Sequence, residues 1–214
     1  MSFRLSQYNV IFWDFDGVIK ESMEAKTWIF RELFKDYGET VQDQVQQHHE
    51  EHGGMSRFEK IPYYFREYLR QTISEAELTQ WCERFSQLSV EQVLKAAWVP
   101  GVYPYLEQFH QRQTFYVVTG TPQEEIEYLL KQLNIETYFV EVFGAPVQKD
   151  HAVRQVLGRK GYALKDCLVV GDSLTDYHAA TNNGVAFLLR TTPINQPLFQ
   201  NIACPRIPDF LEVQ

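Results

Sequence analysis

Residues 8–20, YNVIFWDFDGVIK, restrict the possible folds of this chain more than any other stretch. Val10–Trp13 is apolar and rich in β-branched and aromatic side chains, which is typical of a strand buried on both faces of a parallel sheet. An extended strand directs Asp14 and Asp16, which follow it, to the same side, and the next glycine permits a sharp turn. Because ligands of open α/β sheets bind beyond the carboxyl ends of the strands, this stretch predicts a ligand site.

The two carboxylates of this stretch have two interpretations. Carboxylates this close repel each other unless a cation or a shared proton relieves the repulsion. The functional interpretation is a Mg²⁺ site in which one carboxylate is also a nucleophile. The alternative is an acidic loop after a strand, and a lone D-x-D-G sequence does not separate the two. Later stretches of the chain must decide.

Composition excludes several classes of protein. With 214 residues, 44% of them hydrophobic, the chain is long enough for one α/β domain of ordinary size with an insertion. Its formal charge of −8 and the lack of a basic run argue against nucleic-acid or anionic-membrane binding. No apolar run reaches membrane-spanning length and the N-terminus has no apolar signal segment. The three cysteines have no metal-like spacing and suit a reducing compartment, so a cytoplasmic location is expected.

Residues 21–97 have a helical pattern without β-rich runs, which predicts an all-helical insertion. Two capping boxes are expected within it, Ser56 with Glu59 and Ser74 with Glu77. Pro62 predicts a kink or a late start in the helix that follows Ser56. Residues 74–88 and 90–98 read as two successive helical stretches.

From residue 98 onward, strand and helix patterns alternate, which predicts a parallel sheet with helices on both faces. Its strand ends present Thr119, Lys149 and Asp172 at the same edge as the first two aspartates. Each residue has an ordinary alternative, such as a helix cap or a solvated lysine. Their joint occurrence at strand ends, in this order, favours a functional site. Asp176 is either part of that site or a first-turn acid that stabilises its helix.

The motifs DFDGV, VVTGT, a lysine after the third strand and VVGDSLTD together resemble the haloacid dehalogenase superfamily over nearly the whole chain. The resemblance implies a Rossmann-like parallel core from residues 1–20 and 98–214, with residues 21–97 as a C1-type helical cap. It points to the branch of phosphoglycolate phosphatase and β-phosphoglucomutase.

The same resemblance implies roles for individual residues. Asp14 would be the nucleophile that forms an aspartyl-phosphate, and Asp16 the acid and then the base. Thr119 and the Gly120 N–H would bind the phosphoryl group, with Lys149 compensating charge. The metal set would be Asp14, the Asp16 carbonyl, Asp172 and, as ligand or supporting residue, Asp176.

A Mg²⁺-dependent phosphatase acting on a small phosphorylated metabolite is therefore expected, with oligomeric state open between monomer and homodimer. A sugar phosphomutase is the alternative, because Gly54-Met55-Ser56-Arg57 resembles the stretch with which mutases hold a second phosphate. Mutases usually have a histidine where this chain has Lys26, so Lys26 and Arg57 are expected to bind substrate. Asp16 argues against a dehalogenase, which lacks the second aspartate.

Two non-enzymatic alternatives stay open. A phospho-receiver module also places acids, a threonine and a lysine at strand ends, but its phosphorylated aspartate follows the third strand and it lacks the helical insertion. An inactive relative kept for binding is disfavoured by the intact acidic residues. Repeated turnover would separate an enzyme from both.

Overall fold

The computed structural model describes residues 3–213, and its centre is a six-stranded parallel sheet. The spatial order is β3-β2-β1-β4-β5-β6, so the chain leaves the central β1 toward one edge and returns to build the other. The strands are β1 Val10–Trp13, β2 Thr114–Pro122, β3 Glu141–Ala145, β4 Cys167–Gly171, β5 Ala186–Arg190 and β6 Arg206–Ile207. The switch in direction lies between β1 and β4, where open α/β sheets bind ligands.

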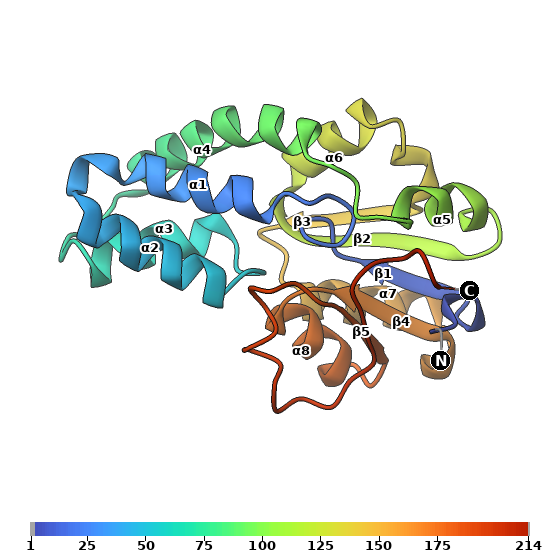
Figure 1. Cartoon of the computed structure of the whole chain (residues 1–214). Helices are drawn as coiled ribbons and strands as arrows, with labels where there is room; N and C mark the ends of the chain where they lie inside the picture. Colours follow the sequence, from blue (N-terminus) through green and yellow to red (C-terminus); the bar gives the residue numbers. More distant parts are fainter. Residues whose placement is uncertain (1–2, 214) are drawn as a thin grey trace.

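Helices cover both faces of this sheet, as the alternating pattern predicts (Figure 1). They are α5 Val102–Phe109, α6 Gln123–Gln132, α7 Lys149–Lys160 and α8 Leu174–Asn182. In β1, Ile11 and Trp13 enter the core cluster that contains residues of α5 and α6, whereas Val10 and Phe12 enter the cluster with residues of α7 and α8. Strand alternation therefore explains why all four residues of β1 are buried.

Four further helices lie beside the sheet rather than on either face (Figure 1). They are α1 Met23–Leu33, α2 Glu39–Glu51, α3 Arg57–Glu67 and α4 Glu75–Lys95. They share an aromatic-rich core of their own, which includes Phe30, Phe34, Tyr64 and Phe85. The name "cap" is used below for this helical unit. None of the helices within residues 3–213 combines the length and the apolar character needed to cross a bilayer.

Local predictions for the cap are met only in part. The Ser74–Glu77 capping box is present. Ser56 caps α3 by accepting from the Phe58 N–H at 3.3 Å, but the Glu59 carboxylate accepts from Gln148 at 2.9 Å, so the second box was wrong.

Two helix boundaries in the cap also differ from the predictions. Helix α3 starts at Arg57 and continues through Pro62, so the late start is not observed, and a kink at Pro62 stays a prediction. The two stretches predicted within residues 74–98 form the single helix α4. In both cases tertiary packing of an apolar face outweighs the local signal.

Candidate active site

Five side chains singled out from the sequence meet at the carboxyl ends of the central strands. Asp14 and Asp16 follow β1, Thr119 lies in β2, Asp172 follows β4 and Lys149 begins α7. All five are buried. Parallel strands in register bring their ends to one edge, and the Asp14 N–H continues the ladder by donating to the Val170 carbonyl at 2.9 Å.

Lys149 links two of the carboxylates. Its Nζ lies 2.8 Å from Asp14 Oδ2 and 2.7 Å from Asp176 Oδ1. The other oxygen of Asp176 accepts from the Ser173 hydroxyl at 2.5 Å and the Ser173 N–H at 3.2 Å, as part of the capping box of α8. Burial opposes the charge of Lys149, but the two carboxylates outweigh it and raise the lysine pKa. Asp176 therefore fixes the position of Lys149 beside Asp14.

The acids around Lys149 are suited to a divalent cation. Ligand oxygens of Asp14, Asp172 and Asp176 all lie within 4.8 Å of one another. Burial, followed by repulsion from Asp176, raises the pKa of Asp14 to about 7, and burial followed by repulsion from Asp14 raises that of Asp172. Among the described residues, no hydrogen bond ends on the Asp172 carboxylate. Buried, mutually repelling oxygens of this kind fit Mg²⁺.

A glycine is required where the Asp172 carboxylate meets the loop after β1. A Cβ at Gly17 would lie 2.1 Å from Asp172 Oδ2, and the backbone there has a φ of 75°. Both the contact and the left-handed backbone exclude a larger side chain without strain. The glycine of the DFDG sequence thus permits the close approach of the two loops that carry acids.

Asp16 is held by three donors, one from a cap helix. Lys26 Nζ donates to Asp16 Oδ2 at 2.5 Å and the Thr121 hydroxyl donates to the same oxygen at 2.8 Å. The Ser22 hydroxyl donates to Oδ1 at 2.6 Å. Burial alone raises the pKa of Asp16, but the Lys26 ammonium and these hydrogen bonds outweigh burial and lower it. In this arrangement Asp16 is held as a carboxylate.

The loop that connects α2 to α3 lies directly on the core loops. A Cβ added at Gly120 would be 2.8 Å from the Gly54 carbonyl, and one at Gly54 would be 1.8 Å from Thr175 Oγ1 and 2.4 Å from Ser173 Oγ. The cavity beneath has a volume of only about 40 Å³. Its walls are formed by core residues that include Asp14, Asp16, Thr119 and Gly120 and cap residues that include Lys26, His49 and Arg57. The cap is therefore closed over the acids.

Arg57 is bound to the core. Its Nη1 and Nη2 donate to the two carboxylate oxygens of Glu125 in α6 at 2.9 and 2.8 Å. The guanidinium also lies over the Phe85 ring, 4.1 Å from its centroid. Ser86 and Ser89 of α4 donate to Glu125 as well, at 2.6 and 3.1 Å. The substrate-binding role of Arg57 stays a prediction, and the structure adds a buried cap–core ion pair at this residue.

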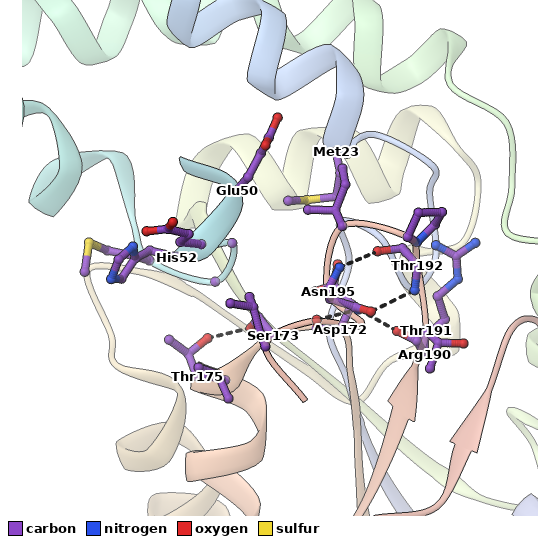
Figure 2. Close-up of a pocket in the computed structure, with 18 of the residues that line it drawn as sticks. Met23, Glu50, His52, Asp172, Ser173, Thr175, Arg190, Thr191, Thr192 and Asn195 are labelled. Carbon is purple, nitrogen blue, oxygen red and sulfur yellow. Dashed lines mark hydrogen bonds between the residues drawn. The ribbon is translucent and has the colours of Figure 1, made fainter. Parts of the chain in front are cut away.

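A larger cavity of about 630 Å³ lies between the cap and the loop after β5 (Figure 2). Met23, Glu50 and His52 line its cap side, and Asp172 and Asn195 its core side. The buried Asn195 amide donates to the carbonyl oxygens of Asp172 at 2.8 Å and Arg190 at 2.9 Å, which holds the loop after β4 against the end of β5.

Sequence reasoning missed several residues that organise the site: Ser22, His49, Thr121, Glu125 and Asn195. A signal existed for Thr121, because strand alternation places it on the same side as Thr119. Glu125 occupies the first turn of α6, where an acid is ordinary, so nothing in the sequence marked its partner.

Comparison with known proteins identifies the family to which this chain is similar. The model of the haloacid dehalogenase-like hydrolases matches residues 10–189. A curated 5'-nucleotidase of Pseudomonas aeruginosa is 28% identical over 92 residues, which are 40% of this chain and 42% of that protein. The match thus spans less than half the length of this relative.

Solved structures share the fold over nearly the whole chain. A mutant of CbbY from Rhodobacter sphaeroides, in complex with xylulose-1,5-bisphosphate, has a TM-score of 0.76 at 15% identity, with 96% of each chain covered. A predicted phosphoglycolate phosphatase of Haemophilus somnus has a TM-score of 0.73 at 22% identity, with 96% of each chain covered. Magnesium-bound YfnB of Bacillus subtilis has a TM-score of 0.68 at 18% identity, with 94% of this chain and 95% of YfnB covered.

The family model covers the first strand, the cap and the core through β5, so the match is not confined to one motif. The resemblance seen in the sequence, the parallel α/β fold and the expectation of a hydrolytic enzyme are confirmed. The chain belongs to the haloacid dehalogenase-like hydrolases.

Proposed function

We propose that this protein is a Mg²⁺-dependent phosphatase that hydrolyses a small phosphorylated metabolite through an aspartyl-phosphate. The observation that carries the proposal is the buried Asp14 carboxylate at the end of the central strand, 2.8 Å from Lys149 and grouped with Asp172 and Asp176. Such a group combines a nucleophile with fixed positive charge in a buried site, which is what phosphoryl transfer requires.

In the first step, an oxygen of Asp14 attacks phosphorus and the bond from phosphorus to the leaving oxygen breaks. The Thr119 hydroxyl and the Gly120 N–H bind phosphoryl oxygens, while Lys149 offsets the charge. The Thr119 oxygen already accepts from the Thr121 N–H at 3.2 Å, so its proton is free for substrate. Mg²⁺ held by Asp14, Asp172 and the Asp16 carbonyl would neutralise phosphoryl charge.

Asp16 acts as the general acid in the first step and as the general base in the second. It gives its proton to the leaving oxygen, then removes a proton from the water that attacks phosphorus and releases Asp14. The contacts with Lys26 and Thr121 favour its carboxylate form, which suits the second step. The first step needs Asp16 protonated, so substrate must weaken the Lys26 contact before the leaving group departs.

A phosphatase is preferred to a phosphomutase because Arg57 is occupied. A mutase needs a free cation for the second phosphate, whereas both Nη atoms of Arg57 hold Glu125. The similar proteins support a small substrate: one is a 5'-nucleotidase and one was crystallised with xylulose-1,5-bisphosphate. Lys26 remains a proposed substrate-binding residue. Arg57 remains one for a substrate whose anion displaces Glu125. Residues 21–97 are the proposed substrate-selecting domain.

Phosphate release from a panel of phosphorylated metabolites and p-nitrophenyl phosphate, with Mg²⁺ present, tests the proposal. Many phosphates released per chain are expected, and this separates an enzyme from a receiver module or a binding protein. Asp14→Asn is the control for contaminating phosphatase. A single phosphate per chain, or equal rates for the parent and Asp14→Asn, would contradict the proposal.

A further inference from the structure

The cap contains a buried lysine–histidine pair that the proposed mechanism does not use. Lys60 of α3 is 0% exposed, and its Nζ lies 2.7 Å from His49 Nδ1 and 3.5 Å from the His49 carbonyl. No ion pair links Lys60 to an acid among residues 3–213. Burial, followed by the charge of Lys26, lowers the pKa of Lys60 well below its ordinary value. Burying a lysine without a carboxylate partner is costly, so the pair is not explained by stability alone.

The contact with Lys60 bears on the tautomer of His49. When Lys60 is protonated its Nζ can only donate, so Nδ1 accepts and the ring proton lies on Nε2. Burial, followed by the charge of Lys60, lowers the pKa of His49 well below its ordinary value, which keeps the ring neutral. His49 therefore presents a neutral N–H donor at its other edge.

That donor has no partner. His49 Nε2 is one of the two buried side-chain polar atoms without a hydrogen bond among the described residues, the other being Trp13 Nε1 in the sheet core. His49 is 3% exposed and lines the 40 Å³ cavity that also contains Asp14, Thr119 and Lys26. An unmet donor in a buried position costs free energy, and a ligand oxygen in this cavity would satisfy it.

We infer that His49 Nε2–H is a specificity donor for an oxygen acceptor on the leaving group, with Lys60 as the residue that positions its proton. The inference rests on the proposed phosphatase function and deepens it. Substrates would be phosphomonoesters that carry hydroxyl or other acceptor oxygens near the ester, and apolar alkyl phosphates would leave the donor unmet. A site that hydrogen-bonds a substrate hydroxyl selects against the analogue that lacks it.

The test compares glycerol 1-phosphate with n-propyl phosphate, which has the same carbon chain without hydroxyl groups. The parent is expected to prefer glycerol 1-phosphate in kcat/KM, and His49→Phe to reduce this preference about three- to ten-fold, the range of one neutral hydrogen bond. His48→Phe is the matched control. His48 is also buried in α2 but bonds Tyr64 at 3.3 Å and does not line the cavity, so the preference should be kept.

A second measurement distinguishes whether Lys60 positions the His49 proton or only fills space beside the ring. Nitrogen NMR shifts of the His49 ring should report the Nε2–H tautomer in the parent. In Lys60→Met, which keeps the volume and removes the donor, the tautomers should mix and the preference should fall although His49 is present. This readout needs no turnover.

The outcomes test the proposed phosphatase function and the role of His49 separately. No phosphate release from any ester by the folded parent would remove the proposed function, and the ring shifts would still decide the tautomer. Release without preference between the two esters, an unchanged preference in His49→Phe, or an Nδ1–H tautomer would overturn the inference.

Discussion

The pair between Arg57 and Glu125 should connect cap and core energetically. Both side chains are buried, with 4% and 5% of their surface exposed, so solvent screens their attraction little. Removing one partner of such a pair costs about 3–5 kcal/mol of unfolding free energy. In Arg57→Met, Glu125 keeps the Ser86 and Ser89 donors, so a value near the lower limit, about 3 kcal/mol, is expected.

The complementary variant should cost less. In Glu125→Gln an amide oxygen still accepts from Arg57, and the guanidinium keeps the Ser86 hydroxyl and the Phe85 ring. About 1.5–3 kcal/mol is expected, the range for a hydrogen bond to a charged group. Arg57→Met combined with Glu125→Gln should be less destabilised than the sum of the single changes, because the double variant leaves no buried charge without its partner.

Urea unfolding of the parent, the single variants and the double variant gives the coupling free energy. Single changes that each cost below about 0.5 kcal/mol and simply add would refute the argument, because that is the behaviour of a solvated pair. A separate measurement tests the predicted contact between Arg57 and a second anionic group of the substrate. If Glu125→Gln raises kcat/KM for 2-phosphoglycolate but not for ethyl phosphate, Glu125 competes with that anion for Arg57.

The remaining predictions concern the nucleophile, the metal, the cap loop and pH. Asp14→Asn should reduce phosphate release to background while circular dichroism shows a folded chain, because an amide cannot attack phosphorus. EDTA should abolish turnover and Mg²⁺ restore it, and full activity in metal-free buffer would contradict the metal assignment. Gly54→Ala should lower kcat/KM at least ten-fold, because its Cβ would lie 1.8 Å from Thr175 Oγ1, whereas Gly158→Ala, with open space around its Cβ, should not. Burial raises the pKa of Glu125, but the charge of Arg57 outweighs burial and lowers this pKa in the folded protein. The stabilisation by the pair is therefore complete above about pH 4.3, the ordinary pKa of a glutamate, and is lost as the pH falls through the pKa of Glu125 in the folded protein. The unfolding free energy of the parent should fall more than that of Glu125→Gln between pH 5 and pH 3.

The core of the site is predictable from the sequence because it depends on sheet geometry. Asp14 and Asp172 directly follow apolar strands, and Thr119 follows the apolar run of β2. Parallel strands deliver such residues to one edge wherever the helices lie. Only the register of neighbouring strands is needed to bring them together. The structure adds the details that depend on packing, such as the 2.7 Å contact between Lys149 and Asp176.

The cap contacts are not predictable in this way. Helix α2 reads as polar and glutamine-rich, yet His48 and His49 are buried because α2 packs against aromatic residues of α1 and α3. Arg57 and Glu125 are 68 residues apart. Glu125 reads as an ordinary first-turn acid and Arg57 as a solvated arginine beside a helix cap. Their pairing depends on where the cap rests on the core, which no local pattern encodes.

The closed arrangement itself constrains how a phosphomonoester enters. Ligand pockets commonly have volumes of about 300–1,000 Å³, whereas the cavity at Asp14 has about 40 Å³. The adjoining cavity of about 630 Å³ shares Met23, Gly53, Met55 and Asp172 with it but is not lined by Asp14. We therefore expect the cap to move when a phosphomonoester reaches Asp14. Movement of the cap away from the core separates Lys26 from Asp16 and Arg57 from Glu125, and each separation leaves a cation on the cap and a carboxylate on the core. An anionic substrate supplies the charge that the cap cations lose. When the cap closes on a substrate, a substrate anion takes the place of the core carboxylate at Lys26, at Arg57 or at both. At Lys26 this exchange releases Asp16, which can then carry the proton that the leaving oxygen needs.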